Sequence, residues 1–419
     1  MDRRWRTAAR VGLVVLVVAA TGGFGPAGAG PGTEKWVSYR GVRLRVPARW
    51  PVVDLAAAPR TCVRQDVEAV YLGTPGADQD CPVHLAPGRA DGLLIRPART
   101  GRGAAAQAVT PGRPLPSRLL RDAAAGHQLR ARLAGTGLEV TAGWAAAPDR
   151  VRRILETAVA TVREAPETTD GQPGAPESGG EAPRTDLVGE AFDRCAAPSD
   201  SAMQAWAAAS PYRGVGVYIG GPSQACAAPG REWVDARVAE GWAFLPIYVG
   251  RQAARGNLLV DADPGTARQQ GADAADDAVH KAEDLGFRPG AVLYNDMENY
   301  DRDQYRDRIL GYLAGWTQQL HAHGYRSGVY AGAASGVKDL AARWDDASYP
   351  QPDVLWAAAW NSHHDVSDAG MGLPEGAGLF AGGRRAHQYA GDTTEEYGGV
   401  RLGIDADYLD VTSPADDGR

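Results

Sequence analysis

The sequence is poor in several features that mark whole classes of protein. Its 44 Lys and Arg residues are outnumbered by 51 Asp and Glu residues, which gives a formal net charge of -7. A chain without a basic excess has no electrostatic reason to bind nucleic acid, so we expect no nucleic-acid partner. The sequence also has no His-Glu-x-x-His motif and no Cys-x-x-Cys spacing. These absences argue against a zinc hydrolase, and we expect neither a metal ion nor another cofactor.

Long apolar runs are also missing, apart from one short run near the N-terminus. The run extends from Val11 to Ala20, follows a segment with four arginines, and precedes the small residues Ala27, Gly28 and Ala29. This order predicts a secretory signal peptide over residues 1–29. An uncleaved anchor is the weaker alternative, because the run is too short to span a bilayer comfortably. We therefore expect a secreted or envelope protein whose mature form has no transmembrane span.

The four cysteines of the chain fall into two local pairs. Cys62 and Cys81 lie in the first half, and Cys195 and Cys226 lie in the second. Exported proteins fold in an oxidising compartment, where cysteines form disulfides. Of the three possible connectivities, bridges within each pair are the simplest, and we predict those two disulfides.

The composition divides the chain into two modules joined by a linker. Residues 166–186 are rich in Pro, Gly, Glu, Ser and Thr and have almost nothing to bury. This predicts a flexible, partly extended linker. An N-terminal module over residues 33–165 precedes it, and a C-terminal module over residues 187–412 follows it.

The N-terminal module has the pattern of a small α+β domain. Val42, Leu44 and Val46 alternate with polar residues, as in a half-buried strand. The segments VEAVYLG and DGLLIRP are typical of two more strands, and residues 148–162 have apolar side chains at helical spacing. No catalytic constellation is visible in this module. We expect it to have a binding or structural role toward a partner that the sequence does not identify.

The C-terminal module alternates short apolar strands with helix-length segments. Amphipathic stretches such as residues 264–285 and 302–323 separate the strands, whereas residues 361–383 have the glycine content of a loop. This rhythm favours a closed parallel (β/α)8 TIM-like barrel over an open sheet. The expected strands are LVGEAFD, GVGVYIGG, FLPIYVG, AVLYNDME, RSGVYAG, VLWAAAWN, RAHQYAG and LGIDADYLD.

Acidic residues close three of these strands, at the barrel end where this architecture places its chemistry. Because side chains alternate along a strand, Asp296 and Glu298 share a face and point into the same mouth. Crowding raises the pKa of at least one carboxyl group, as acid catalysis of glycosidic cleavage needs. Taken singly, each acid is more simply explained as a helix N-cap or a solvated loop residue. The combination of Asp-x-Glu with two other strand-end Asp residues favours a site. The candidates are Asp193 on the first strand, Asp296 and Glu298 on the fourth, and Asp405 with Asp407 on the last.

Aromatic residues near the strand ends favour a carbohydrate ligand, because flat rings stack on the faces of sugar rings. Core packing or barrel closure is the alternative for each ring taken alone. A polar side chain near the seventh strand end is a further candidate contact. The candidate substrate-binding residues are Tyr218, Tyr248, Tyr294, Trp360, Gln388 and Tyr389.

Seven motifs of the C-terminal module carry a resemblance to a known family: AFDRCAAPS, YIGG, PIYVG, YNDMENY, GVYAG, HQYAG and GIDADYLD. In these motifs the chain resembles the secreted actinobacterial glycoside-hydrolase-like family known as domain of unknown function 1906. That family is similar to the family 25 lysozymes. The resemblance covers nearly all of the C-terminal module. It implies a barrel with an Asp on the first strand, Asp-x-Glu on the fourth and an Asp on the last.

The resemblance also implies a role for each acid. Asp193 and Asp405 match the acids of the first and last strands. Glu298 would be the general acid, and Asp296 would orient the acetamido group of the substrate so that this group acts as an internal nucleophile. The lysozymes commonly have Asp-x-Ser on the first strand, whereas this chain has Asp193, Arg194 and Cys195. We therefore expect its first loop to be held differently.

The leading hypothesis from these patterns is a retaining, metal-independent glycoside hydrolase at the cell envelope. Its expected substrate is an N-acetylated cell-wall polysaccharide such as peptidoglycan. The alternative, from a different functional class, is a catalytically silent barrel that binds envelope glycan.

Overall fold

A computed structural model describes residues 34–83, 85, 87–99, 107–160 and 181–413. The expected signal peptide over residues 1–29 lies outside this described part. The same is true of residues 166–180, which make up most of the expected linker. No helix in the described part is long and apolar enough to cross a membrane.

The described part of the N-terminal module contains two sheets and two short helices, which confirms a small α+β domain. The sheets enclose an apolar core with Trp50, Val140 and Trp144 among its buried members. One sheet has the order β1 (Glu34–Tyr39), β2 (Val42–Pro47) and β9 (Val159–Ala160). The other has the order β3 (Val52–Asp54), β4 (Val70–Leu72), β5 (Gly92–Pro97), β8 (Leu138–Gly143), β7 (Gln128–Leu133) and β6 (Ala108–Val109). The helices are α1 (Ser117–Asp122) and α2 (Asp149–Glu156).

The helix expected over residues 148–162 is shorter than its apolar pattern indicates. Helix α2 ends at Glu156, and Val159 then pairs with Arg43 in the small sheet. Val159 is a β-branched residue, which suits an extended strand better than a last helical turn. The expected C-terminal end of the helix is therefore wrong. Pairing with a strand that is distant in sequence competes with the helical pattern there.

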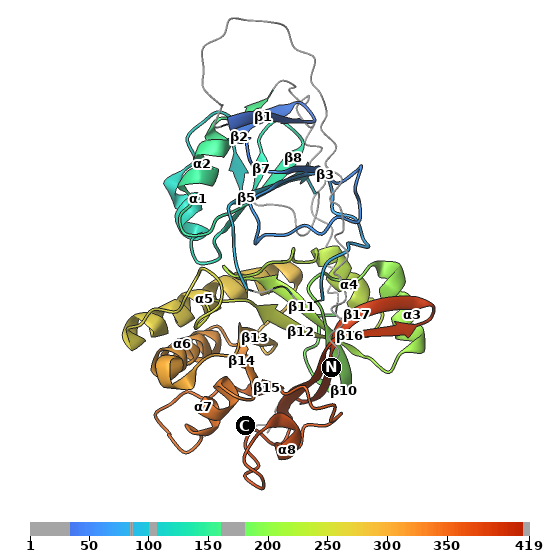
Figure 1. Ribbon diagram of the computed structural model, residues 1–419, viewed down its shortest axis with the longest axis vertical. Helices are drawn as coiled ribbons and strands as arrows, with labels where there is room; N and C mark the ends of the chain where they lie inside the picture. The colour runs from blue at the N-terminus through green and yellow to red at the C-terminus, as the bar shows by residue number, and fades with distance from the viewer. Residues whose placement is uncertain (1–33, 84, 86, 100–106, 161–180, 414–419) are drawn as a thin grey trace, which may run out of the picture.

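The C-terminal module forms a closed barrel of eight strands, as expected (Figure 1). Helices α5 and α6 match their expected segments to within one residue at each end. The elements are, in order, β10 (Leu187–Asp193), α3 (Asp200–Ala209), β11 (Gly214–Gly220), α4 (Arg231–Ala239), β12 (Ala243–Tyr248), α5 (Pro264–Leu285), β13 (Val292–Met297), α6 (Arg302–Ala322), β14 (Arg326–Gly332), α7 (Gly336–Ala341), β15 (Val354–Ala358), α8 (Asp368–Met371), β16 (Arg384–Tyr397) and β17 (Val400–Val411).

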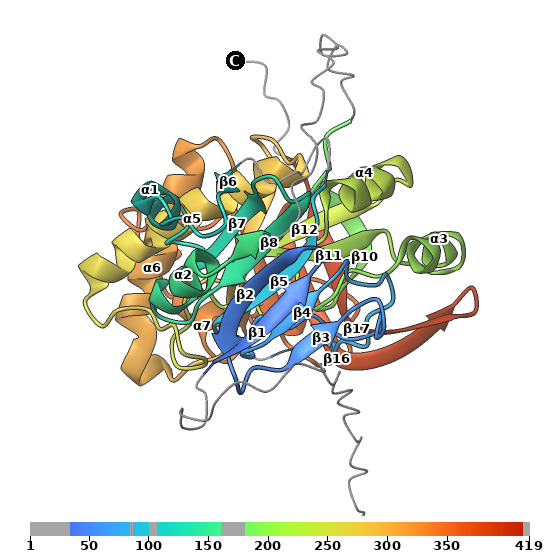
Figure 2. The same cartoon turned by 90° about the horizontal axis from the view of Figure 1, so that it is seen from above.

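The eighth strand departs from the all-parallel barrel expected from the sequence. Strand β17 is antiparallel to both of its neighbours, β10 and β16. A tight turn joins β16 to β17, because Gly398 and Gly399 have positive φ angles of 59° and 76°. A hairpin has no room for a crossover helix, so the strand must return in the opposite direction. The long β16–β17 hairpin projects beyond the barrel wall (Figure 2).

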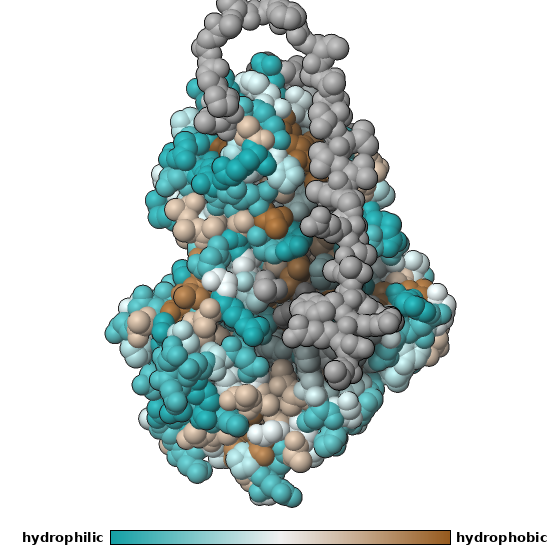
Figure 3. All heavy atoms as spheres, in the orientation of Figure 1, coloured by the Kyte–Doolittle hydropathy of each residue, from teal (hydrophilic) through white to brown (hydrophobic). Residues whose placement is uncertain are grey.

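Side chains of the barrel alternate between an inner and an outer core. Inside the barrel, Leu245 and Ile247 pack with Trp356. Outside it, Phe244 and Tyr248 belong to the layer between strands and helices. The period of two in a strand sets this alternation, and it decides which residues at a strand end can face the mouth. Hydrophilic side chains dominate the outer surface over α6 and α7 (Figure 3).

Residues 183–186, which their composition assigns to the linker, belong to the barrel instead. Thr185 is buried, and its hydroxyl oxygen accepts a hydrogen bond from the backbone N–H of Val292 (3.0 Å). Asp186 forms an ion pair with Arg326 (2.8 Å). Polar residues are therefore used here to seal the closed end of the barrel, and composition alone does not distinguish them from linker residues.

The N-terminal module rests on the loops that follow β10, β11 and β12 (Figures 1 and 2). These loops lie at the carboxyl ends of the strands, the end of the barrel that holds the acids. Three backbone hydrogen bonds of 2.8 Å join the two modules there. Their donors and acceptors are Gln65 N–H to Ala225 O, Gly88 N–H to Ser223 O, and Cys195 N–H to Val83 O.

A buried arginine strengthens this junction. Arg89 is only 3% exposed, and its guanidinium donates to the carbonyl oxygens of Gly221 and Pro222. Its backbone carbonyl accepts a hydrogen bond from the side-chain amide of Asn257 (2.6 Å). Burial lowers the pKa of Arg89 to about 10. The two modules thus share a desolvated interface in which carbonyl dipoles surround a cation.

Candidate functional site

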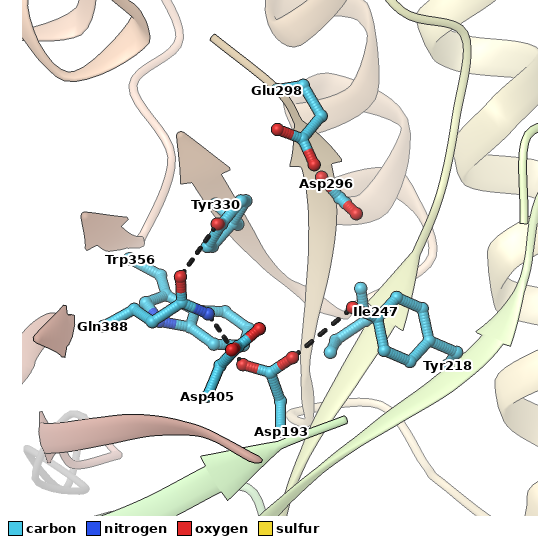
Figure 4. A pocket seen from close by; sticks show the side chains of 9 residues that line it. All are labelled: Asp193, Tyr218, Ile247, Asp296, Glu298, Tyr330, Trp356, Gln388 and Asp405. Carbon is cyan, nitrogen blue, oxygen red and sulfur yellow. Dashed lines mark hydrogen bonds between the residues drawn. The ribbon is translucent and has the colours of Figure 1, made fainter. Parts of the chain in front are cut away.

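Four carboxylates from three strands meet at the mouth of the barrel and line one pocket (Figure 4). Asp193 ends β10, Asp296 lies near the end of β13, and Glu298 follows that strand. Asp405 comes from β17, directly opposite Asp193 in the antiparallel pairing. Met297, between two of the acids, packs in the outer core. We call this site the acidic pocket.

Hydrogen bonds fix Asp193 from both sides of the acidic pocket. Gln388 donates through Nε2 to Asp193 Oδ2 (2.8 Å), and the hydroxyl of Tyr218 donates to Oδ1 (3.4 Å). The amide oxygen of Gln388 accepts hydrogen bonds from the Tyr330 hydroxyl (3.0 Å) and from Trp360 Nε1 (2.9 Å). Trp360 itself is 59% exposed at the rim. One amide therefore connects a buried acid to an aromatic ring that is open to a ligand.

Burial and mutual repulsion raise the pKa values of two acids in this pocket. For Asp193 the larger cause is burial, and the charge of Asp405 adds to it. For Asp296 burial is again the larger cause, followed by the charge of Glu298. Groups with raised pKa values hold a proton into a higher pH range than a free carboxyl group does. The pocket can therefore hold protonated and ionised acids side by side, which is the arrangement that acid catalysis uses.

Gln252 holds the backbone of the Asp-x-Glu segment, a role that the sequence did not reveal. It lies in the loop after β12 and is fully buried. Its Nε2 donates to the carbonyl of Asp296 (2.8 Å), and its Oε1 accepts from the backbone N–H of Glu298 (3.0 Å). In the same loop, Arg255 Nη1 lies 4.0 Å from Glu298 Oε2. The loop after β12 thus approaches both Asp296 and Glu298.

Aromatic residues of the barrel interior form the floor of the acidic pocket. Tyr330 and Trp356 line it, with ring centroids 5.0 Å apart in an edge-to-face arrangement. Trp356 Nε1 donates to Asp407, which lies deeper in the barrel (2.9 Å). Neither ring is among the substrate-binding residues that the sequence indicates. Their inward direction follows from the alternation of side chains along a strand. Tyr330 lies two residues after Gly328, and Trp356 lies two residues after Val354, so each ring shares the inner face of its strand with that earlier residue.

Three of the expected substrate-binding rings lie away from the pocket. Tyr248 points outward and donates to Asp277 of α5 (2.8 Å). Tyr389 also points outward, donates to Glu190 (2.9 Å) and stacks on His364. Tyr294 points inward but is fully buried one layer below Asp296, against Trp356. Closeness to a strand end was the wrong criterion for these rings, because it ignored which face each ring occupies. Tyr218, Trp360 and Gln388 remain at or beside the pocket.

Both expected disulfides are present, Cys62–Cys81 and Cys195–Cys226. The second joins the loop after β10 to the loop after β11, so the first loop of the barrel is tied covalently to the second. Among the described residues, no group of three or more His, Cys, Asp or Glu side chains is arranged to hold a metal ion.

Comparison with known proteins places the barrel in a family. Residues 204–409 match the Rv2525c-like, glycoside hydrolase-like domain family. No curated protein matches the chain. The match begins after β10, so Asp193 lies outside it.

Several solved structures are similar to about half of this chain at low identity. An uncharacterized protein of B. stearothermophilus is 20% identical, with 52% of this chain and 95% of that chain covered and a TM-score of 0.37. The catalytic domain of endolysin ply40 from bacteriophage P40 of Listeria monocytogenes is 13% identical, with 53% and 93% covered and a TM-score of 0.35. The spore cortex lytic enzyme SleM of Clostridium perfringens is 14% identical, with 53% and 67% covered and a TM-score of 0.36.

The motifs of the sequence, the closed barrel and the family match agree with one another. Residues 204–409 of this chain therefore belong to the Rv2525c-like, glycoside hydrolase-like domain family, the domain of unknown function 1906 that the motifs indicated.

Proposed function

We propose that this protein is a secreted glycoside hydrolase that cleaves an N-acetylated cell-wall glycan such as peptidoglycan. The observation that carries the proposal is the acidic pocket, in which Asp193, Asp296, Glu298 and Asp405 converge at the mouth of a barrel from a glycoside-hydrolase-like family. Two disulfides and the signal-peptide pattern support export, since such bridges persist in oxidising compartments.

In the proposed reaction, Glu298 donates a proton to the glycosidic oxygen as the bond from this oxygen to the anomeric carbon breaks. The carbonyl oxygen of the substrate's own acetamido group attacks the anomeric carbon, and Asp296 stabilises the positive charge that develops on the acetamido nitrogen. Water then attacks the same carbon, and the ionised Glu298 accepts its proton. Two displacements at one carbon retain the anomeric configuration. No step needs a metal ion.

The remaining residues of the pocket orient the sugar. Asp193 is held by Gln388 and Tyr218, so it can accept hydrogen bonds from sugar hydroxyls at a fixed position. Trp360 offers an exposed ring at the rim on which a neighbouring sugar can stack. Fixed acceptors and flat rings are what a polysaccharide site needs for orientation.

Insoluble cell walls provide the direct test, because one incubation reports both new reducing ends and co-sedimentation of the protein. We expect wild-type protein to release reducing ends. Glu298→Gln keeps the shape of the side chain but has no transferable proton, so its turnover should fall by about a hundredfold or more while it still co-sediments. Full activity of Glu298→Gln would exclude this residue as the acid. Binding by wild-type protein without any release would instead support the silent glycan-binding barrel.

A further inference from the structure

A groove between the two modules lies beside the acidic pocket. One wall comes mainly from the six-stranded sheet of the N-terminal module, and the other from the loops after β10 and β11. No described residue lines both the groove and the acidic pocket. Along both loops, the bridged residues Cys195 and Cys226 separate the residues of the acidic pocket from those of the groove. We call this second site the intermodule groove, and its volume of about 310 Å³ suits a small ligand such as one sugar unit.

The sheet of the N-terminal module presents a polar face to this groove. Its other face packs into the core of the module, where Ile95 and Leu129 are buried. Because side chains alternate along a strand, the residues that follow them, Arg96 and Arg130, occupy the opposite face. Both line the groove, together with Thr141 on the strand between them. The alternation thus directs two guanidinium groups toward the groove.

The positive charge of this face is only partly balanced. Among the described residues that line the groove, three are arginines and one is acidic. Arg96 and Arg130 share one oxygen of the buried Glu139, at 2.6 Å and 3.5 Å. Burial is the largest cause that lowers the pKa of Arg130; the charge of Glu139 opposes it, and the charge of Arg96 lowers the pKa further. An anion bound in the groove would offset the cost of holding these two cations together.

The acidic residues at the opposite wall are engaged with other cations. Asp200 forms an ion pair with Arg237 (2.8 Å), and Glu232 forms one with Arg99. Gly230, the N-cap of α4, also lines the groove and provides no side-chain cap for the first helical turn. The N-terminus of a helix carries a partial positive charge. Both walls therefore favour a negatively charged ligand.

An aromatic ring completes the intermodule groove. Trp233 of α4 lines it, and its Nε1 donates to the carbonyl oxygen of Pro198 (2.7 Å). The guanidinium of Arg237 lies 5.0 Å from the ring centroid, so the orientation of the ring is fixed. Flat rings stack on the faces of sugar rings, and guanidinium groups bind carboxylate or phosphate oxygens in pairs. A groove that offers both suits a sugar that carries an oxyanion.

We propose that the intermodule groove binds a sugar unit with an oxyanion substituent, with Arg96 and Arg130 holding the anion and Trp233 contacting the ring. A phosphodiester-linked glycan and a glycan of acidic sugars both contain such a unit. The N-terminal module contributes the anion-binding half of this second glycan site, which the barrel alone lacks. The assignment does not rest on the proposed hydrolysis, because the groove is separate from the acidic pocket.

Binding of three sugar tetramers, measured by calorimetry, tests this assignment. A phosphodiester-linked mannose tetramer supplies phosphates, tetragalacturonate supplies carboxylates, and mannotetraose is the neutral reference. None of them contains an acetamido group, so none resembles the proposed substrate of the acidic pocket. Each titration is repeated at high salt, which screens charge interactions.

Four variants accompany the wild type, and thermal melting confirms that each of them folds. Arg130→Gln removes the more weakly paired cation of the sheet. Thr141→Glu adds a carboxylate beside that cation, because Thr141 pairs with Arg130 across the strands. Trp233→Ala removes the ring. Arg121→Gln is the matched control, since it removes one positive charge from α1 of the same module, outside the groove.

We expect wild-type protein to bind at least one anionic tetramer about tenfold more tightly than mannotetraose, because charge-assisted hydrogen bonds add to the stacking contact. The anionic tetramer that binds more tightly identifies the source of the oxyanion. Arg130→Gln and Thr141→Glu should lose most of this preference, and Arg121→Gln should keep it. Trp233→Ala should weaken binding of all three tetramers.

Equal binding of the three tetramers by the wild type, or no binding of any, would overturn the proposal. An unchanged preference for the anionic tetramer in folded Arg130→Gln and Thr141→Glu would do so as well. These experiments measure binding of sugars that the acidic pocket is not proposed to cleave. A failure to hydrolyse cell walls therefore contradicts the proposed function and leaves this second site standing.

Discussion

Asp193 of β10 and Asp405 of β17 face each other across an antiparallel strand pair, and both line the acidic pocket. Like charges directly opposite each other on one face of a sheet are destabilising. The barrel keeps this arrangement although Asp407, two residues further along β17, adds a third buried carboxyl group. The end of the barrel that holds the acids thus has a cost in stability, and that cost depends on pH.

Asp407→Asn should stabilise the protein at neutral pH. Burial, and after it the charge of Asp193, raises the pKa of Asp407 well above its usual value. An Asp whose pKa is raised in the folded state stabilises the fold at pH values below the ordinary Asp pKa of about 3.9. This contribution to stability is lost as the pH rises through the raised pKa. The amide cannot ionise, and its oxygen can still accept the hydrogen bond from Trp356.

Urea unfolding from pH 4 to pH 8 measures this effect. The wild type should lose stability as the pH rises, and Asp407→Asn should lose less. Asp261→Asn, at an exposed position, is the control and should follow the wild-type curve. If Asp407→Asn and the wild type lose stability in parallel over this range, the titration of Asp407 is not the cause.

Gln252→Leu should reduce turnover while leaving glycan binding nearly intact. The leucine has similar bulk but loses both hydrogen bonds that hold the backbone of Asp296 and Glu298. Misplacement of a catalytic group by about 1 Å can cost about a hundredfold in rate. We expect kcat to fall by about 10- to 100-fold with KM changed much less. Gln269→Leu, on the exposed surface of α5, should behave as wild type, and a loss confined to KM would disprove the positioning role.

Removing the Cys195–Cys226 disulfide should destabilise the barrel end that holds the acids. The cysteines are 31 residues apart, and the chain-entropy model gives about 3–4 kcal/mol for a loop of this size. The double variant Cys195→Ala with Cys226→Ala should therefore lower the free energy of unfolding by about that amount. The comparison is a variant that lacks the Cys62–Cys81 bridge, whose cysteines are 19 residues apart. Mass spectrometry that finds either Cys195 or Cys226 as a free thiol would contradict the pairing.

Arg89→Met should lower the stability of both modules in a single unfolding transition. The methionine fills part of the volume but leaves the carbonyls of Gly221 and Pro222 without their donor, at a cost of about 1–3 kcal/mol for each. Chemical unfolding followed by tryptophan fluorescence should show one transition, shifted to lower denaturant. Arg49→Met, at an exposed ion pair with Glu68, should change stability by less than about 1 kcal/mol. Two separate transitions in the wild type would show that the modules are independent.

Two simple rules together place the acids from the sequence. Asp296 and Glu298 were assigned from their strand-end position and from the alternation of side chains, and the structure brings both to one pocket. The strand-end position alone does not place Tyr248 and Tyr389 correctly. The second rule would have turned both outward, since Ile247 and Gln388 are the neighbours that face inward.

Other parts of the site depend on contacts between distant segments that leave no local pattern. Gln252 belongs to a loop, and its partners are backbone atoms, which every sequence has. The same holds for Arg89, which binds carbonyl oxygens rather than acidic side chains. Residues 183–186 seal the barrel with polar groups, so their composition resembles that of a linker. Pairings of this kind become visible only when the fold brings the segments together.

The antiparallel β17 also has a consequence for how the chain acquires its structure. Leu187, in the first barrel strand, pairs with Val411, near the end of the last one. The barrel can therefore close only after all eight of its strands have been synthesised, and contacts so distant in sequence form slowly. Until then the edges of β10 and β16 remain unpaired and open to other chains. Shortening the chain by its last strand should accordingly yield an aggregating protein rather than a smaller barrel.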